Sequence, residues 1–386
     1  MRRIGLLGAA LLNFPLYWLA RALPAQRGLV VFGAWFGERY SDSPRSVFEA
    51  ARSDSDLRAV WITRNREVLR GLRAAGAEAY LSTSVKAYWL VARSECVVVC
   101  TSLRDVNRFA PCRRVLNTWH GVPTMKRIMR DDANFKARPR LVQILAPYVR
   151  SDLQHEVLSC SLEERRRMAS AFGVPERMVH MTGLPRHDRL TVGISHGSGS
   201  RRHGLYLPTH RGEGAGSLED LFDGIERLDD ELTSLNASLR VKLHHYHGAD
   251  SGAVQGLKNI EIVDDSSWNF DLQEELASCD FLVTDYSSVA IDFLVTGRPI
   301  VYFAPDLEKY LHTEGRGDFY YEYYDVVAGP ICDSWGQVSD ELSEMFSGRD
   351  AYFARRRHHA ERFVPMSDGV STSRVLELLK QRPETA

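Results

Sequence analysis

Residues 281–303 read FLVTDYSSVAIDFLVTGRPIVYF, and this stretch contains the pattern that decides the fold. The apolar runs at 281–284 and 300–303 have the length and composition of buried strands. Between them, an apolar repeat of three to four residues begins after Ser288 and predicts a helix. Two buried strands joined by a helix run parallel, so the stretch predicts a doubly wound α/β sheet covered on both faces.

The same alternation extends over most of the chain and divides into two series. Further strands are predicted at 28–35, 59–63, 96–100, 115–119 and 143–146, and then at 204–207, 239–243 and 260–263. Helices are predicted at 44–53, 67–75 and 84–93. Between the series, residues 193–200 read GISHGSGS, which is typical of a linker. We therefore expect an apolar segment at 1–27, an amino-terminal domain at 28–192, a linker at 193–203 and a carboxy-terminal domain at 204–386, with the two domains facing across a cleft.

The charge of the chain is divided between its halves. The 386 residues include 49 Lys and Arg and 50 Asp and Glu, for a formal charge of -1. Residues 1–192 hold 31 basic and 17 acidic side chains, whereas residues 193–386 hold 18 and 33. Residues 101–150 alone hold 11 basic and 3 acidic side chains. This basic region predicts contact with an anionic membrane surface rather than with nucleic acid.

The amino terminus has an apolar run from Ile4 to Ala20 in which Asn13 is the one strongly polar residue. About 20 apolar residues are needed to span a bilayer, and Pro15 interrupts the run. Three interpretations remain open: an interfacial or anchoring segment, a cleaved signal peptide, and a helix packed on the first domain. An interfacial segment would place the protein at the cytoplasmic face of the cell membrane, peripherally or by an amino-terminal anchor.

No pattern in the sequence predicts a metal site. The six cysteines form no CxxC pair and are expected to be buried free thiols in a reducing compartment. His244, His245 and His247 follow a predicted strand, but neighbouring side chains of an extended segment point in opposite directions. We therefore expect one histidine, His244, to face a phosphate group, with a solvated or packed histidine cluster as the alternative.

The sequence NTWHGVPTMK at 117–126 predicts a general base at the end of a strand. His120 has an ordinary pKa near 6.5 and is suited to accept a proton at neutral pH. Gly121 allows the backbone to approach a ligand closely.

A second group of residues predicts an anion site. Ser287 and Ser288 precede a predicted helix, where free N–H groups and the helix dipole favour negative charge, although a plain helix cap is the alternative. The glycine-rich loop at 206–214 supplies Thr209 and Arg211, and a second loop supplies Arg316. Asp285 is expected to orient a backbone or hydroxyl group.

Taken together, these segments resemble the CDP-glycerol glycerophosphotransferase family of teichoic-acid primases and polymerases. The matching pieces are FGERYSDSPRSVFEA, NTWHGVPTMK, GLPRHDRL, YLPTHR, VKLHH, VTDYSSVAIDFLVTGRPIVYF and, more loosely, DLEKYLHTEGRGDFYYEY. They cover roughly residues 28–330 in the order typical of the family. The resemblance implies a GT-B-like fold of two Rossmann-type domains, with the nucleotide held mainly by the second.

The resemblance also implies a reaction. A hydroxyl of a lipid-linked glycan or growing polymer would attack the β-phosphorus of CDP-glycerol or a related CDP-alditol and release CMP. His120 would be the base, and His244, Arg211, Arg316 and the Ser287–Ser288 turn would hold the pyrophosphate. Lys126 and Arg186 are further substrate-binding candidates from the matching segments. No cofactor is required, and the residues are compatible with Mg²⁺.

Two rival functions share parts of this pattern. A GT-B glycosyltransferase would use the same fold and anion site to move a sugar from a nucleotide sugar. A non-catalytic membrane assembly protein would retain the fold without the transfer. The nucleotide product separates the first rival from the main interpretation, and the effect of replacing His120 separates the second.

Overall fold

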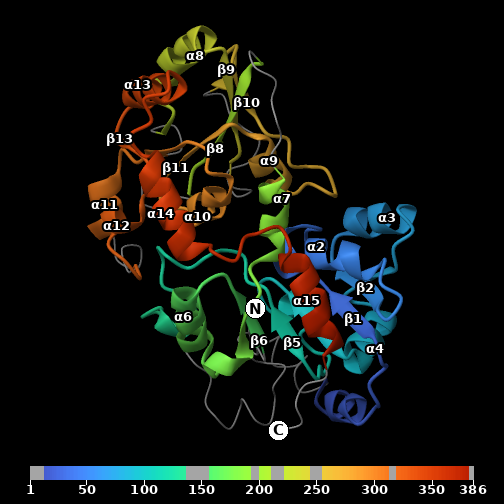
Figure 1. Cartoon of the computed structure of the whole chain (residues 1–386). Helices are drawn as coiled ribbons and strands as arrows, with labels where there is room; N and C mark the ends of the chain where they lie inside the picture. Colours follow the sequence, from blue (N-terminus) through green and yellow to red (C-terminus); the bar gives the residue numbers. More distant parts are fainter. Residues whose placement is uncertain are drawn as a thin grey trace.

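A computed structural model of the chain describes residues 13–135, 156–192, 200–209, 221–243, 254–312 and 319–381. Within these residues the strands form two parallel sheets, one in each half of the chain (Figure 1). The first has the order β3-β2-β1-β4-β5-β6-β7 and the second the order β10-β9-β8-β11-β12-β13. The predicted α/β fold with two doubly wound domains is therefore confirmed.

Most of the predicted strands are present at nearly the predicted positions. The strands of the first sheet are β1 (Leu29–Phe32), β2 (Arg58–Thr63), β3 (Ala79–Leu81), β4 (Cys96–Val99), β5 (Val115–Asn117), β6 (Glu156–Ser159) and β7 (Val179–Met181). Those of the second are β8 (Arg202–Leu207), β9 (Ala237–Val241), β10 (Ile260–Ile262), β11 (Phe281–Thr284), β12 (Ile300–Phe303) and β13 (Ile331–Cys332). The strand predicted at 143–146 and most of the predicted linker lie outside the described residues.

Alternate residues of each central strand are buried on opposite faces of its sheet. In β1, Val30 and Phe32 belong to the cluster that includes α2 (Asp42–Ala51) and α3 (Arg66–Ala74), whereas Leu29 and Val31 belong to the cluster that includes α4 (Val85–Arg93). Because both faces are covered, the strand is apolar throughout and shows no alternation of polar and apolar residues.

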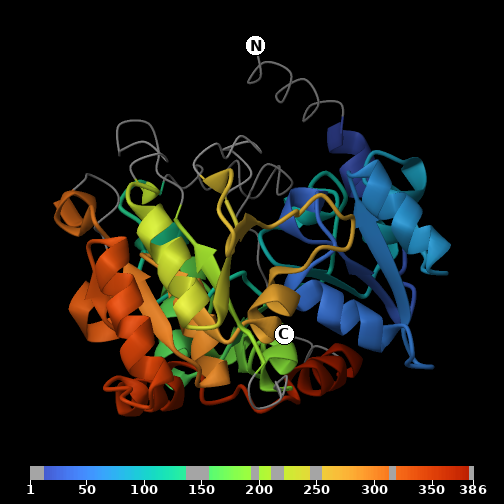
Figure 2. The same cartoon turned by 90° about the horizontal axis from the view of Figure 1, so that it is seen from above.

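The second sheet is built in the same way. Phe281 and Val283 of β11 pack in the cluster of α8 (Ile225–Ser234) and α13 (Trp335–Phe346), and Leu282 packs on the opposite face toward α10 (Val289–Phe293). Further helices are α6 (Leu162–Phe172), α7 (Asp188–Thr191), α9 (Leu272–Ser278), α11 (Leu307–His312), α12 (Tyr323–Val326), α14 (Phe353–Phe363) and α15 (Ser371–Lys380). Figure 2 shows helices along the outer sides of the strands in both halves of the molecule.

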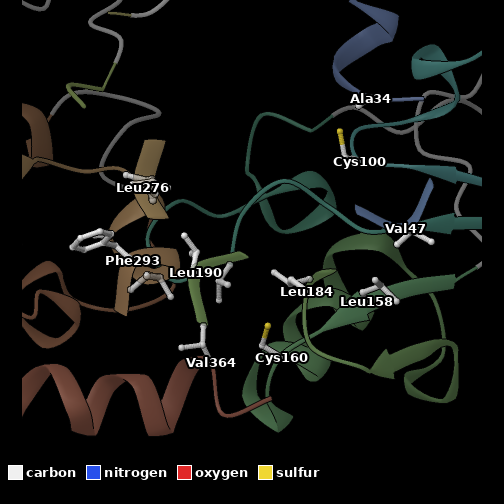
Figure 3. Close-up of a cluster of buried hydrophobic side chains, with 14 of the residues drawn as sticks. Ala34, Val47, Cys100, Leu158, Cys160, Leu184, Leu190, Leu276, Phe293 and Val364 are labelled. Carbon is white, nitrogen blue, oxygen red and sulfur yellow. The ribbon is translucent and has the colours of Figure 1, made fainter. Parts of the chain in front are cut away.

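The two halves share one apolar core at their junction. A single cluster of buried side chains joins Val47 and Leu184 of the first half to Leu276 and Phe293 of the second (Figure 3). The last helix, α15, returns to the first half and packs beside α2 (Figure 1). There, Arg114 donates hydrogen bonds of 3.1 Å to the carbonyl of Leu378. These contacts join the two halves of the molecule through one core and one returning helix.

Candidate active site

A cavity of about 320 Å³ lies between the two halves of the molecule. The first half contributes Trp35, Asp42 and His120 to its wall, and the second contributes Lys242, Ser287 and Ser288. Each of these residues lies at or soon after the carboxyl end of a parallel strand, which is where open α/β sheets bind ligands.

His120 lies in the loop after β5 and is oriented by the backbone of the neighbouring strand. Its Nδ1 is 3.0 Å from the carbonyl oxygen of Cys100, and its ring lies 5.1 Å from that of Trp35. A carbonyl oxygen only accepts hydrogen bonds, so Nδ1 carries the proton and Nε2 of the neutral ring has a lone pair. Burial lowers the pKa of His120 below its ordinary value, which favours this neutral form.

Gly121 brings the histidine loop against the second half of the molecule. A Cβ atom at this position would lie 2.7 Å from the Oγ of Ser288, closer than real side chains approach. The absence of a side chain therefore permits the loop after β5 to contact the turn that precedes α10. Ser287 partly caps this turn by accepting a 3.4 Å hydrogen bond from the amide of Val289.

Asp285 organises the loop opposite this turn. Its carboxylate is buried and accepts hydrogen bonds of 3.0 and 2.9 Å from the amide of Thr209. The Thr209 hydroxyl also donates to this carboxylate. Asp285 therefore fixes the loop that follows β8, adjacent to Leu207 and Pro208 in the cavity wall.

Arg186 was expected to contact the substrate, but in the structure it lies in a buried charge network. Its side chain is 1% exposed, and Nη2 donates to Asp292 Oδ1 over 2.9 Å. Asp42 is 3.5 Å away on the other side, and Nη1 donates to the carbonyl of Trp119 over 3.0 Å. Arg186 therefore ties α2 and α10 together and holds the backbone of the residue that precedes His120.

The other predicted site residues are distributed differently. Lys126 is exposed, with its ammonium group 5.5 Å from the centre of the Tyr310 ring, and it does not line the described wall of the cavity. His244, Arg211 and Arg316 lie outside the described residues.

Residues 16–381 match the family described as CDP-Glycerol:Poly(glycerophosphate) glycerophosphotransferase. The chain belongs to this family. The predicted resemblance is confirmed, and so is the prediction that the protein is a transferase of this type.

Individual relatives agree over almost their full lengths. The teichoic acid glycerol-phosphate transferase of Staphylococcus aureus is 26% identical, and the match covers 92% of this chain and 93% of that protein. The teichoic acid ribitol-phosphate primase of Bacillus spizizenii is 25% identical, with 94% and 93% covered. A crystal structure of the wall teichoic acid polymerase TagF, soaked with CDPG, superposes with a TM-score of 0.74 at 23% identity, with 95% of this chain and 92% of that chain covered. This likeness confirms the GT-B-like fold.

Several residues of the transferase cavity were not predicted. Arg39 and Asp42 lie in FGERYSDSP, a segment that supported the resemblance but received no role, and Trp35 immediately precedes it. Trp35 and Asp42 have positive φ angles of 48° and 67°, which residues other than glycine rarely adopt. Lys242, two residues before His244, also lines the cavity and pairs with Asp265 over 2.8 Å. Sequence order alone does not show that Arg39 reaches the same Asp265 from the other half, over 2.9 Å.

Proposed function

We propose that this transferase moves glycerol phosphate, or a related alditol phosphate, from a CDP-alditol to a hydroxyl of a lipid-linked glycan or growing polymer and releases CMP. The product belongs to teichoic-acid or capsule-type polymers of the cell surface. The observation that carries the proposal is the geometry of His120, whose Nδ1 is committed to Cys100 and which lines the cavity between the halves. Family membership supports the choice of donor.

The residues of the cavity suit an in-line displacement. The acceptor hydroxyl gives its proton to Nε2 of His120 as its oxygen bonds to the β-phosphorus of the donor. The bond from that phosphorus to the bridging oxygen of CMP breaks, and CMP leaves with the electron pair. A phosphodiester remains on the acceptor. Lys242 and the hydroxyls of Ser287 and Ser288 supply positive charge and donors for the phosphate oxygens.

The released nucleotide tests this function. Purified protein is incubated with a lipid-linked disaccharide and either CDP-glycerol, CDP-ribitol or a panel of nucleotide sugars. The proposal expects CMP from a CDP-alditol and no nucleoside diphosphate from the sugars. Nucleoside diphosphate as the sole product would identify a glycosyltransferase and overturn the proposal. If none of the donors is consumed, the chain is a non-catalytic relative and the proposal is equally wrong.

The pH dependence of transfer is expected to reflect the lowered pKa of His120. The base is active when neutral, and a lowered pKa preserves the neutral form in more acidic solution. Activity is therefore lost as the pH falls through a value below the ordinary 6.5 of histidine. Measurement of kcat/KM for CMP release from about pH 5 to about pH 8 locates this acidic limb. A limb above 6.5 would contradict a histidine base with a lowered pKa.

We further propose that the transferase is a peripheral protein of the cytoplasmic membrane face. No helix among the described residues is long and apolar enough to span a bilayer. Residues 13–21 form a helix that buries Tyr17 and Ala20 against the first half, while Leu16 and Leu19 are 51% and 71% exposed. Phe14 and Trp18 are exposed beside them. This apolar face on a basic half suits insertion into the interface of anionic lipid. Residues 4–12 of the predicted apolar run lie outside the described residues.

Substitution of both exposed leucines tests this location. The double variant Leu16→Glu, Leu19→Glu is expected to weaken binding to anionic vesicles by at least about tenfold, because two apolar side chains are lost from the lipid contact. Vesicle flotation measures the bound fraction. Phe353→Glu on α14, which is 52% exposed in the wild-type protein, is the matched control and should bind normally. The proposal would be refuted if the bound fraction of the wild-type protein were independent of salt concentration and of anionic lipid content.

A further inference from the structure

A second cavity of about 440 Å³ lies next to the one that contains His120. Trp35, Arg39 and Phe270 line both cavities, so the two share a wall. The lining of the second cavity also includes Phe36 and Glu38 of the first half and Trp268 of the second. None of these residues was assigned a role from the sequence, and the transfer step described above does not use them.

Two aromatic residues of the second cavity are held in an unusual conformation. Trp35 and Phe36 have φ angles of 48° and 59°, in the left-handed region that bulky side chains avoid. The buried carboxylate of Asp105 accepts a 2.7 Å hydrogen bond from the amide of Phe36, and the thiol of Cys100 lies 3.4 Å from the amide of Trp35. Strained backbone that the surroundings enforce is concentrated at functional sites.

The same anchor also orients the catalytic base. Cys100 uses its thiol for Trp35 and its carbonyl for Nδ1 of His120. The Trp35 ring lies 5.1 Å from the imidazole. A ligand that rests on this aromatic pair is therefore placed at a defined position relative to Nε2, as an acceptor hydroxyl requires.

The lining favours a sugar ring over other ligands. A pyranose has an apolar face of C–H groups that packs on aromatic rings and a rim of hydroxyls that bind carboxylates. Phe36 is 41% exposed and lies beneath the guanidinium of Arg104, 5.0 Å from its ring centre, which leaves its other face available. Glu38 and Asp265 supply carboxylate acceptors. Nucleotide phosphates are disfavoured because, among the described residues that line this cavity, Arg39 is the single cation and lies beside two acidic side chains, Glu38 and Asp265.

We propose that the second cavity binds a sugar ring of the acceptor and so presents the acceptor hydroxyl to His120. The inference rests on the proposed function and adds a location for the acceptor, with Trp35 and Phe36 as its aromatic floor. The donor nucleotide then occupies the first cavity on the side of Lys242, Ser287 and Ser288.

Kinetics with both substrates varied test the assignment. Phe36→Ala is expected to raise the KM for a lipid-linked disaccharide with a shortened lipid by about tenfold, because one stacking surface is lost. The KM for CDP-glycerol should stay unchanged. Phe36→Tyr retains the ring and should behave as wild type. Phe353→Ala removes a ring of comparable exposure elsewhere, 52% against 41%, as a control. A thermal melt of each variant confirms that it is folded.

The results also separate failure of this inference from failure of the proposed function. A rise in the KM for CDP-glycerol alone would assign the cavity to the nucleotide, and an unchanged KM for both substrates would show that Phe36 contacts neither. Either result overturns the inference while wild-type CMP release upholds the function. Titration of tryptophan fluorescence with the same disaccharide measures binding without turnover. Suppose that the wild-type protein binds the disaccharide but releases no CMP, and that Phe36→Ala weakens this binding. That result would support the sugar site and refute the proposed function.

Discussion

His120→Ala is expected to lower kcat for CMP release by about 10²–10⁴ with little change in folding, because the variant lacks the group that accepts the hydroxyl proton. The remaining activity would come from positioning and from the charges around the phosphates, which the substitution leaves in place. His120 is partly exposed to the cavity, and its side-chain hydrogen bond goes to the carbonyl of Cys100. A rapid-quench or coupled assay of CMP release measures the loss.

A matched control separates the base from a general effect of losing a histidine. His312→Ala on α11 removes an imidazole that is 81% exposed, and it should leave kcat unchanged. If His120→Ala releases CMP at the wild-type rate, His120 is not the base. If both variants lose activity together with their thermal transitions, the effect belongs to folding and the assignment of His120 is again unsupported.

Asp292→Ala is expected to lower the free energy of unfolding by about 3–5 kcal/mol, because it leaves the guanidinium of Arg186 buried without its main partner. Asp292 Oδ1 is 2.9 Å from Nη2 of Arg186 and 2.8 Å from Nε2 of His187. Burial alone would raise the pKa of Asp292, but Arg186 and His187 hold it below its ordinary value. The carboxylate is therefore charged at neutral pH, and its interactions with Arg186 and His187 contribute to stability there.

Urea denaturation at neutral pH measures this destabilisation. Asp368→Ala is the control, since Asp368 pairs with Arg374 at the surface with a side-chain exposure of 46%. Loss of such an exposed pair is expected to cost at most about 1 kcal/mol. Equal shifts in the two variants would show that the buried network contributes no more than a surface pair. Arg186 also donates to the carbonyl of Trp119, the residue before His120. Folded Asp292→Ala protein is therefore expected to have a lower kcat than the wild type.

The sequence predicted the fold well where strands are buried on both faces. β1, β4, β11 and β12 are continuous apolar runs because helices cover both sides of each sheet, and that composition is visible without a structure. Four strands were missed. β3, β7 and β13 have only three, three and two residues, and β6 is a four-residue strand that begins at Glu156 and ends at Ser159, so none of them forms a clear apolar run. The carboxy-terminal domain was expected to span 204–386 and so to include α15, yet Arg114 and α2 hold this helix on the first half.

The candidate site shows the same limit at the level of single residues. His120 was identifiable because a histidine and a glycine after a strand combine a base with space for a ligand. Its tautomer was not, because it depends on the carbonyl of Cys100 twenty residues away. Arg186 shows the opposite case. An arginine in a loop suggests a bound anionic substrate, but in the structure Arg186 pairs with the carboxylates of Asp42 and Asp292. The positive φ angles of Trp35 and Phe36 could not be predicted from the sequence, because bulky residues rarely adopt this conformation.

The mass of the acceptor product tests the central claim most directly. Wild-type protein and His120→Ala are incubated with CDP-glycerol and a lipid-linked disaccharide, and the acceptor is analysed by mass spectrometry. The account predicts that the wild-type reaction adds the mass of one or more glycerol phosphate units, with stoichiometric CMP, and that His120→Ala forms this product at least about a hundredfold more slowly. An acceptor whose mass stays unchanged with wild-type protein, or one extended equally fast by His120→Ala, would contradict it.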